Sequence, residues 1–150
     1  MTISAFAAAK KVCELSDWTL SNLQLQKILY LAHMIYMGEN DGEPLVDGHF
    51  QAWDYGPVHP AIYHKAKAFG RGHVKNVFHG AKDLPDSSRE AALLKRAVDS
   101  LGKVSPSTLV SITHSSTGAW YKHYEPGCNR SIIPDHDIYQ EYKARFGRDE

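Results

Sequence analysis

The spacing of apolar side chains predicts a chain that is mostly helical. The strongest pattern covers residues 21–37, where apolar residues recur every three or four positions and occupy more than one face. Ser21 and Gln24 have the spacing of a capping box at its start, and Gly38 is placed to supply a left-handed cap at its end. We therefore expect this segment to be the central helix. The residues expected to be almost fully buried in it are Leu29, Ala32 and Ile35.

Shorter periodic segments before and after it bring the prediction to about six helices. Each begins at a residue type that favours a first helical turn. These residues are either polar side chains that accept from free backbone N–H groups or prolines, whose missing N–H costs little there. The expected starts are Ser4, Pro60, a second capping box of Ser87 and Glu90, Ser105 with Pro106, Ser115 or Ser116, and Pro134 with Asp135.

Residues 49–55 alternate loosely between apolar and polar side chains and are rich in aromatics, which is typical of a short strand. Gly56-Pro57 is expected to end it in a rigid turn, because glycine reaches unusual dihedral angles and proline fixes φ. A short strand is also expected within 129–133, whereas 73–86 shows no clear period. The predicted fold is mainly α, a compact single domain over residues 1–150 with a small two- or three-stranded β element.

The charge balance narrows the choice of partners. Lys plus Arg and Asp plus Glu number 17 each, so the formal net charge is zero. Such a chain is poorly suited to nonspecific nucleic-acid binding or to a polybasic membrane patch, because both need an excess of cations. The nine histidines add positive charge only near pH 6. We therefore expect neither a nucleic acid nor a membrane as partner.

The cysteines and histidines do not predict a metal site. Cys13 and Cys128 are expected to be reduced thiols in a cytoplasmic protein. The histidines lack HExxH spacing and the cysteines form no CxxC pair, so we expect no metal and no other cofactor. The N-terminal residues run into lysines rather than a signal-peptide cleavage site, and no apolar run approaches the length of a membrane span.

The best candidate for nucleophilic chemistry is His114 beside Ser115 and Ser116. An imidazole next to a hydroxyl can activate it, which makes a small cytoplasmic hydrolase with a His, Cys or Ser site the alternative function. The simpler interpretation is that His114 ends one helix and the serines cap the next. Because the chain also lacks a G-x-S-x-G elbow and a glycine-rich phosphate loop, we expect no enzyme activity.

A group of large aromatic side chains with polar tips suits either the edge of a core or a protein interface. Alternation along the predicted strand places Trp53 and Tyr55 on one face. The pattern alone favours neither role. The other members of the group are Tyr63, Trp120, Tyr121 and Tyr124.

Two ordered blocks of the sequence resemble the Panacea domain, also called the SocA-like antitoxin or phage-associated GepA-like domain. The first block is LQLQKILYLA at residues 23–32, and the second is FQAWDYGPVHPAIY at residues 50–63. A linker with Gly42, Pro44 and Leu45 joins them, as the family pattern requires. This two-part motif is long, so it is far more specific than a short glycine signature.

Later residues also resemble the second half of the family pattern, so the likeness covers about residues 5–145. They are Thr113-His114, Trp120-Tyr121 and the EPG turn before Ile-Ile-Pro. Two departures are visible: Ile28 stands where leucine is commoner, and the 73–86 loop has no clear counterpart.

The resemblance implies an antitoxin, a small bacterial or phage protein encoded beside a toxin that it neutralises. Its partner is then a cognate toxin protein, and family members are paired with toxins of many unrelated kinds. The resemblance implies neutralisation by direct protein binding, or action as an adaptor that delivers the toxin to the ClpXP protease. The identity of the toxin does not follow from it.

Two roles are open for the residues of the shared motif. In one, Gln26, Lys27 and Tyr30 meet the aromatic group and His114 in a polar pocket or groove. In the other, Gln26 and Tyr30 hydrogen-bond the strand and its turn internally. We favour the scaffold role, because residues shared by proteins with different partners fit a scaffold better than a contact surface. The full set is Gln26, Lys27, Tyr30, Trp53, Tyr55, Gly56, Pro57, Pro60, Tyr63, His114, Trp120 and Tyr121.

The residues that would choose the partner are expected beside the motif rather than within it. Loops and exposed helix faces tolerate variation while a scaffold holds them in place. The expected surface is the outer face of the helix after Pro60 together with the 70–86 loop. The candidate residues are His64, Lys65, Lys67 and Arg71.

Overall fold

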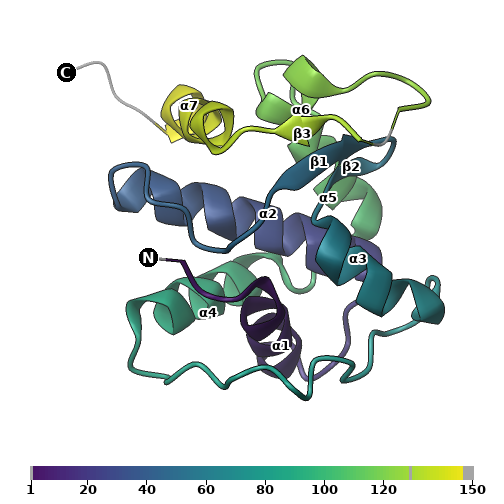
Figure 1. Cartoon of the computed structure of the whole chain (residues 1–150), viewed down its shortest axis with the longest axis vertical. Coiled ribbons are helices and arrows are strands. Elements are labelled where there is room, and N and C mark those ends of the chain that lie inside the picture. Colours follow the sequence, from purple (N-terminus) through teal and green to yellow (C-terminus); the bar gives the residue numbers. More distant parts are fainter. Residues whose placement is uncertain (1, 129, 147–150) are drawn as a thin grey trace.

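The longest helix, α2 (Asn22–Glu39), runs through the middle of the structure (Figure 1). The structure is a computed structural model that describes residues 2–128 and 130–146. Helices α1 and α4 lie on one side of α2, and the sheet, α6 and α7 lie on the other (Figure 1). The helices besides α2 are α1 (Ala5–Leu15), α3 (Pro60–Ala66), α4 (Arg89–Leu101), α5 (Pro106–Thr113), α6 (Ala119–His123) and α7 (Asp135–Phe146). A 3-10 turn, η1 (Lys67–Phe69), follows α3.

The mainly helical prediction is confirmed, and so is the central position of α2. The helix packs against α1, α3, α4, α5, α7 and β2. At its start Ser21 Oγ accepts from the Gln24 backbone N–H, while Gln24 Oε1 accepts from the Ser21 backbone N–H, so the predicted capping box is present. Leu29 and Ala32 are fully buried as expected. Ile35 is only half-buried, so the prediction for that residue is wrong.

Gly38 does not end the helix, contrary to the prediction. The helix continues to Glu39, and the left-handed backbone follows at Asp41 and Gly42. A Cβ atom at Gly38 would lie 2.2 Å from the ring of Tyr142 on α7. The glycine therefore allows α7 to pack closely on α2, which is a tertiary reason that helical spacing does not reveal.

The small β element is a three-stranded antiparallel sheet in the order β2-β1-β3. Its strands are β1 (Phe50–Trp53), β2 (Gly56–Val58) and β3 (Ile132–Ile133). Residues 56 and 57 open a second strand instead of only ending the first, and Gly56 does so with φ of 115°. Strand β3 lies within the predicted 129–133 segment, of which Asn129 lies outside the described residues.

Four of the six predicted starts of the other helices are confirmed and two are wrong. Ser4 and Ser105 accept from the first turns of α1 and α5, α3 begins at Pro60, and α7 begins at Asp135. At α4 the cap is Ser88, so the proposed box of Ser87 and Glu90 does not form. At α6 the N-cap position is Gly118, and neither Ser115 nor Ser116 caps the helix.

Because Leu29 is fully buried at the centre of α2, Leu29→Ala should lower the free energy of unfolding by about 2–5 kcal/mol. The loss combines the hydrophobic transfer free energy of the atoms that are removed with the free-energy cost of the cavity that they leave behind. Urea denaturation followed by circular dichroism measures it. Leu23→Ala, at a half-buried leucine of the same helix, is the matched control and should cost less. Equal losses for the two variants would contradict the central position of Leu29.

Candidate functional site

A pocket of about 530 Å3 lies between the N-terminal half of α2, the β1–β2 turn and α3. We call it the aromatic pocket, because Trp53, Tyr55 and Tyr63 form much of its wall. The rings of Trp53 and Tyr63 meet edge to face, with their centres 4.7 Å apart. Gln26 and Lys27 contribute from α2, and Arg71 from the chain after η1. This size and a mainly apolar lining with a few polar groups are typical of binding sites.

Gln26 holds the segment that enters α3. Its side chain is buried, and its Oε1 accepts from the His59 backbone N–H at 2.8 Å. Its Nε2 lies 3.4 Å from the His59 carbonyl oxygen and 3.3 Å from Asn22 Oδ1. The amide thus pairs with both backbone groups of His59, as a neighbouring strand would. Pro60, the next residue, is the first residue of α3.

Lys27 lies under the β1–β2 turn with only 1% of its surface exposed. Its Nζ donates to the Pro57 carbonyl oxygen at 3.0 Å. Gly56 is required above it, because a Cβ there would lie 2.7 Å from Lys27 Cε. Burial disfavours the charged ammonium and lowers the pKa of Lys27 to about 7.

Among the described residues, the Tyr30 hydroxyl does not hydrogen-bond the sheet or its turn, although its ring meets Phe50 of β1 edge to face at 5.3 Å. Its hydroxyl donates to Glu141 Oε1 on α7 at 2.8 Å. The same Oε1 accepts from the Ala119 backbone N–H at 3.0 Å, and Oε2 accepts from Arg145 Nε at 2.8 Å. The buried carboxylate therefore replaces the serine cap expected at α6. Burial and the nearby Glu141 charge raise the pKa of Tyr30 well above its ordinary value.

His114 stacks on Trp120 instead of meeting a nucleophile. The two rings are 3.7 Å apart and nearly parallel, and Trp120 Nε1 donates to the Trp53 carbonyl oxygen at 2.7 Å. His114 Nε2 is buried with no hydrogen-bond partner among the described residues. Burial, and secondarily the charge of Lys27, lowers the pKa of His114. Ser115 Oγ instead lies 3.0 Å from Thr117 Oγ1.

The cysteines do not complete a nucleophilic site within the described residues. Cys13 is fully buried in the core, and burial, together with Glu14, raises the pKa of its thiol to about 12. Such a thiol is unreactive near neutral pH. The Cys128 sulfur lies 3.8 Å from Ser131 Oγ. The described ranges also hold no group of three His, Cys, Asp or Glu side chains suited to a metal ion.

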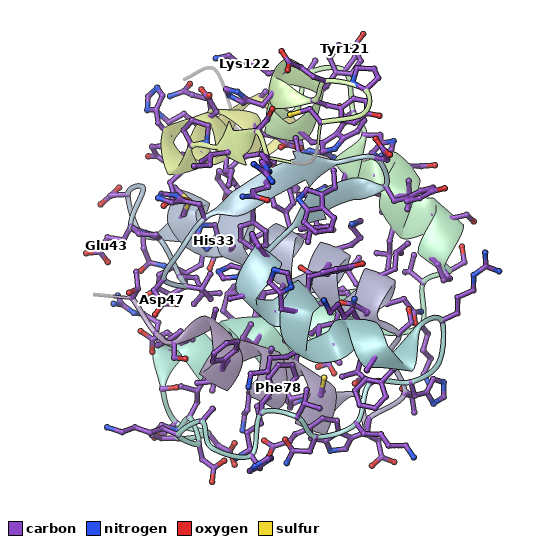
Figure 2. The ribbon with its side chains drawn as sticks, turned by 45° about the vertical axis from the view of Figure 1, so that its right-hand side comes forward. His33, Glu43, Asp47, Phe78, Tyr121 and Lys122 are labelled. Carbon is purple, nitrogen blue, oxygen red and sulfur yellow. The ribbon has the colours of Figure 1, made fainter. Side chains whose placement is uncertain are left out.

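Two of the predicted aromatic residues lie at the surface. Tyr55 belongs to the turn after β1 and is 71% exposed, so the prediction that it shares a strand face with Trp53 is wrong. Tyr121 lies on α6 and is 58% exposed. Figure 2 shows it beside Lys122 at the outer end of the molecule, whereas His33 lies in the interior.

The candidate partner-surface residues are exposed as a group. They are His64, Lys65, Lys67 and Arg71. Lys65 Nζ lies 5.8 Å from the centre of the Phe6 ring on α1, a cation–π geometry that orients its stem. Arg71 belongs to both this surface and the aromatic pocket.

Sequence reasoning missed Glu141 and His59, which hold the motif residues in place. Glu141 carries one local signal, its i, i+4 spacing from Arg145, but that spacing is common on exposed helices. His59 donates through Nε2 to the Asp47 carbonyl oxygen at 2.8 Å. The bonds of Glu141 to Tyr30 and Ala119, and of His59 to Asp47, join residues at least twelve positions apart, so no helical or strand period predicts them.

The Tyr30–Glu141 bond generates a double-mutant prediction. Tyr30→Phe and Glu141→Gln should each reduce the free energy of unfolding, and the cycle should show a coupling of about 1–3 kcal/mol. Tyr124→Phe with Asp54→Asn is the matched control, because that hydroxyl–carboxylate bond of 2.6 Å is exposed. Its coupling should be smaller. Additive effects at the buried pair, measured by urea denaturation, would contradict the assigned role of Glu141.

No solved structure matches this chain. Antitoxin SocA of Caulobacter vibrioides (strain NA1000 / CB15N) is 35% identical to it over 113 residues. The aligned region is 69% of this chain and 60% of that protein, so the chain spans well under the full length of the curated relative.

A family model described as "Antitoxin SocA-like, Panacea domain" matches residues 25–121. That range extends from α2 through the sheet strands β1 and β2 to α6, and it includes the walls of the aromatic pocket on β1 and α3. It covers more than half of the chain, and it agrees with the motif blocks recognised in the sequence. The chain therefore belongs to the antitoxin SocA-like, Panacea domain family.

Proposed function

We propose that this chain is an antitoxin that neutralises a cognate toxin protein by direct binding in the cytoplasm, without catalysis of its own. The observation that carries the proposal is the family match over residues 25–121, supported by the similarity to a protein named Antitoxin SocA. The arrangement of His114 supports the absence of catalysis, because its ring stacks on Trp120 and no hydrogen bond joins it to Ser115 or Ser116 among the described residues.

The distribution of buried and exposed residues supports a division between scaffold and contact surface. Gln26, Lys27 and Tyr30 are buried and bonded internally, so they hold the turn, α3 and α7 in place. Beside them the outer face of α3 is exposed. That face continues into the 70–86 loop.

The 70–86 loop is fixed at a few points and exposed between them. The Val74 backbone N–H donates to the Leu20 carbonyl oxygen at 2.8 Å, and the buried Phe78 packs near Phe6 of α1 (Figure 2). Asp83 forms an ion pair with Lys10 at 2.7 Å. A loop held this way presents its exposed side chains in a defined place. We assign partner choice to this loop and the outer face of α3.

Expression of the neighbouring gene product with and without this chain tests the proposal, with bacterial growth as the measurement. Growth arrest that the chain relieves, together with a complex of the two purified proteins, is the expected result. Repeating the assay in a host that lacks ClpX tests delivery to ClpXP. Rescue that persists there indicates neutralisation by binding alone, and rescue that disappears indicates the adaptor mechanism. Failure to relieve arrest by any neighbouring protein would contradict the antitoxin function.

The charge reversals Lys65→Glu and Lys67→Glu should weaken rescue together while leaving the melting temperature unchanged. Both residues are exposed on the proposed contact surface, and cations there attract an acidic partner and accelerate association. The difference from the original protein should narrow as salt is added, because salt screens exposed charges. Lys95→Glu with Lys103→Glu, at exposed positions on and just after α4, is the matched control. Full rescue by the α3 double variant would place the interface elsewhere.

His114→Phe and Cys128→Ser should preserve neutralisation. Phenylalanine keeps the stack on Trp120 while removing the imidazole, and serine keeps the size of the cysteine while removing the thiol. Growth rescue is measured beside the melting temperature, so that a folding defect is recognised. Loss of rescue in a variant that melts like the original protein would favour the hydrolase alternative.

A further inference from the structure

The aromatic pocket is lined by a buried lysine, Lys27, that has no acidic partner among the described residues. An ammonium has three donors, and the described residues offer Lys27 a single acceptor, the Pro57 carbonyl oxygen at 3.0 Å. Every ion pair within the described ranges involves other residues. Burying an unpaired charge is costly, and the cost is relieved when an anion enters.

The groups that face Lys27 leave this charge unopposed. It packs beneath β2 and close to α5, where Thr113 Oγ1 already donates to the carbonyl oxygens of Leu109 and Val110. Burial lowers the pKa of His114, also on this side, and so favours its neutral ring. The other charged residues of the pocket wall are Asp54 and the exposed Arg71. Asp54 already accepts from the Tyr124 hydroxyl.

The remaining wall suits an apolar side chain. Trp53 and Tyr63 form an aromatic corner, and Tyr55 stands exposed at the rim. Aromatic rings and a desolvated cation are the residue types that anchor protein interfaces. The pocket also adjoins the proposed contact surface, because Tyr63 lies on α3 next to His64, and Arg71 borders both.

We propose that the aromatic pocket receives an acidic side chain of the partner protein, with the Lys27 ammonium as its counter-ion and the rings of Trp53 and Tyr63 against a neighbouring apolar side chain. This assignment rests on the proposed function only in that the chain binds a protein. It gives Lys27 a role in recognition besides its bond to the turn.

The assignment has a consequence for pH. A carboxylate beside the ammonium favours the charged form, so binding raises the pKa of Lys27 above its value of about 7 in the free protein. Binding therefore takes up a proton near pH 8. Affinity should be highest below pH 7 and should fall as the pH rises through the pKa of the bound state.

Peptide titrations test the proposal on the full-length protein. The probes are the blocked peptides Ac-Gly-Phe-Glu-Leu-Gly-NH2 and Ac-Gly-Phe-Gln-Leu-Gly-NH2, followed by amide NMR shifts at pH 6 and pH 9. We expect the glutamate peptide to bind about tenfold more tightly at pH 6, as one charge-assisted hydrogen bond predicts. That preference should shrink at pH 9. It should vanish in Lys27→Met and persist in Lys103→Met, whose lysine is exposed and does not line the pocket.

A second measurement uses the original protein, so it does not depend on whether Lys27→Met folds correctly. The Cε resonance of Lys27 in the original protein reports its pKa, which the glutamate peptide should raise and the glutamine peptide should not. Equal affinity for the two peptides at pH 6, or an unchanged Lys27 pKa, would overturn the proposal. Phenylacetate binding as tightly as the glutamate peptide would also overturn it, since the site would then suit a small carboxylate.

The peptide test and the growth test fail independently. Growth rescue without any glutamate preference leaves the antitoxin function standing and removes only the pocket assignment. Glutamate preference without growth rescue leaves the pocket assignment and removes the antitoxin function.

Discussion

A row of four buried polar side chains along α2 determines where the surrounding elements lie. Gln26, Lys27, Tyr30 and His33 are each 2% exposed or less. Gln26 bonds the segment before α3, Lys27 bonds β2, and Tyr30 and His33 bond Glu141 and Asp135 on α7. A buried polar group without a partner is costly, so each bond makes one arrangement of its element more stable than the alternatives. The apolar stripe of α2 drives its burial, whereas the polar row specifies what covers it.

This division explains what the sequence could predict. Capping and helical period depend on neighbours within a few residues, so the starts of α1, α2 and α5 were correct. The errors at Gly38 and at the α6 cap both arise from α7, through Tyr142 and Glu141. Lys27 bonds Pro57, 30 residues away along the chain, and Tyr30 bonds Glu141, 111 residues away. No local pattern encodes such distant partners. The pocket is built from the same distant contacts, so the sequence could name several of its members, such as Gln26, Lys27 and Trp53, but not their arrangement.

The motif residues differ in whether their structural role accounts for all of their chemistry. The fold alone accounts for Gln26 and Gly56, without a ligand. Gln26 accepts from the backbone N–H of His59, and a Cβ at Gly56 would collide with Lys27. Lys27 meets a structural requirement with one of its three donors, and its charge is more than that single bond requires. A neutral donor would hold the turn at lower electrostatic cost. This excess of charge over structural need distinguishes Lys27 from its neighbours and links the scaffold to recognition.

The dependence on α7 has a consequence for synthesis of the chain. Tyr30 and His33 leave the ribosome about a hundred residues before Glu141 and Asp135, their partners. During that interval the central helix carries unsatisfied polar groups, and β1 lacks its β3 neighbour at Ile133. Contacts of such long range form late in folding. The nascent polypeptide thus satisfies the polar row of α2 only near the end of translation, and shortened products that lack α7 would be unstable and open to proteolysis.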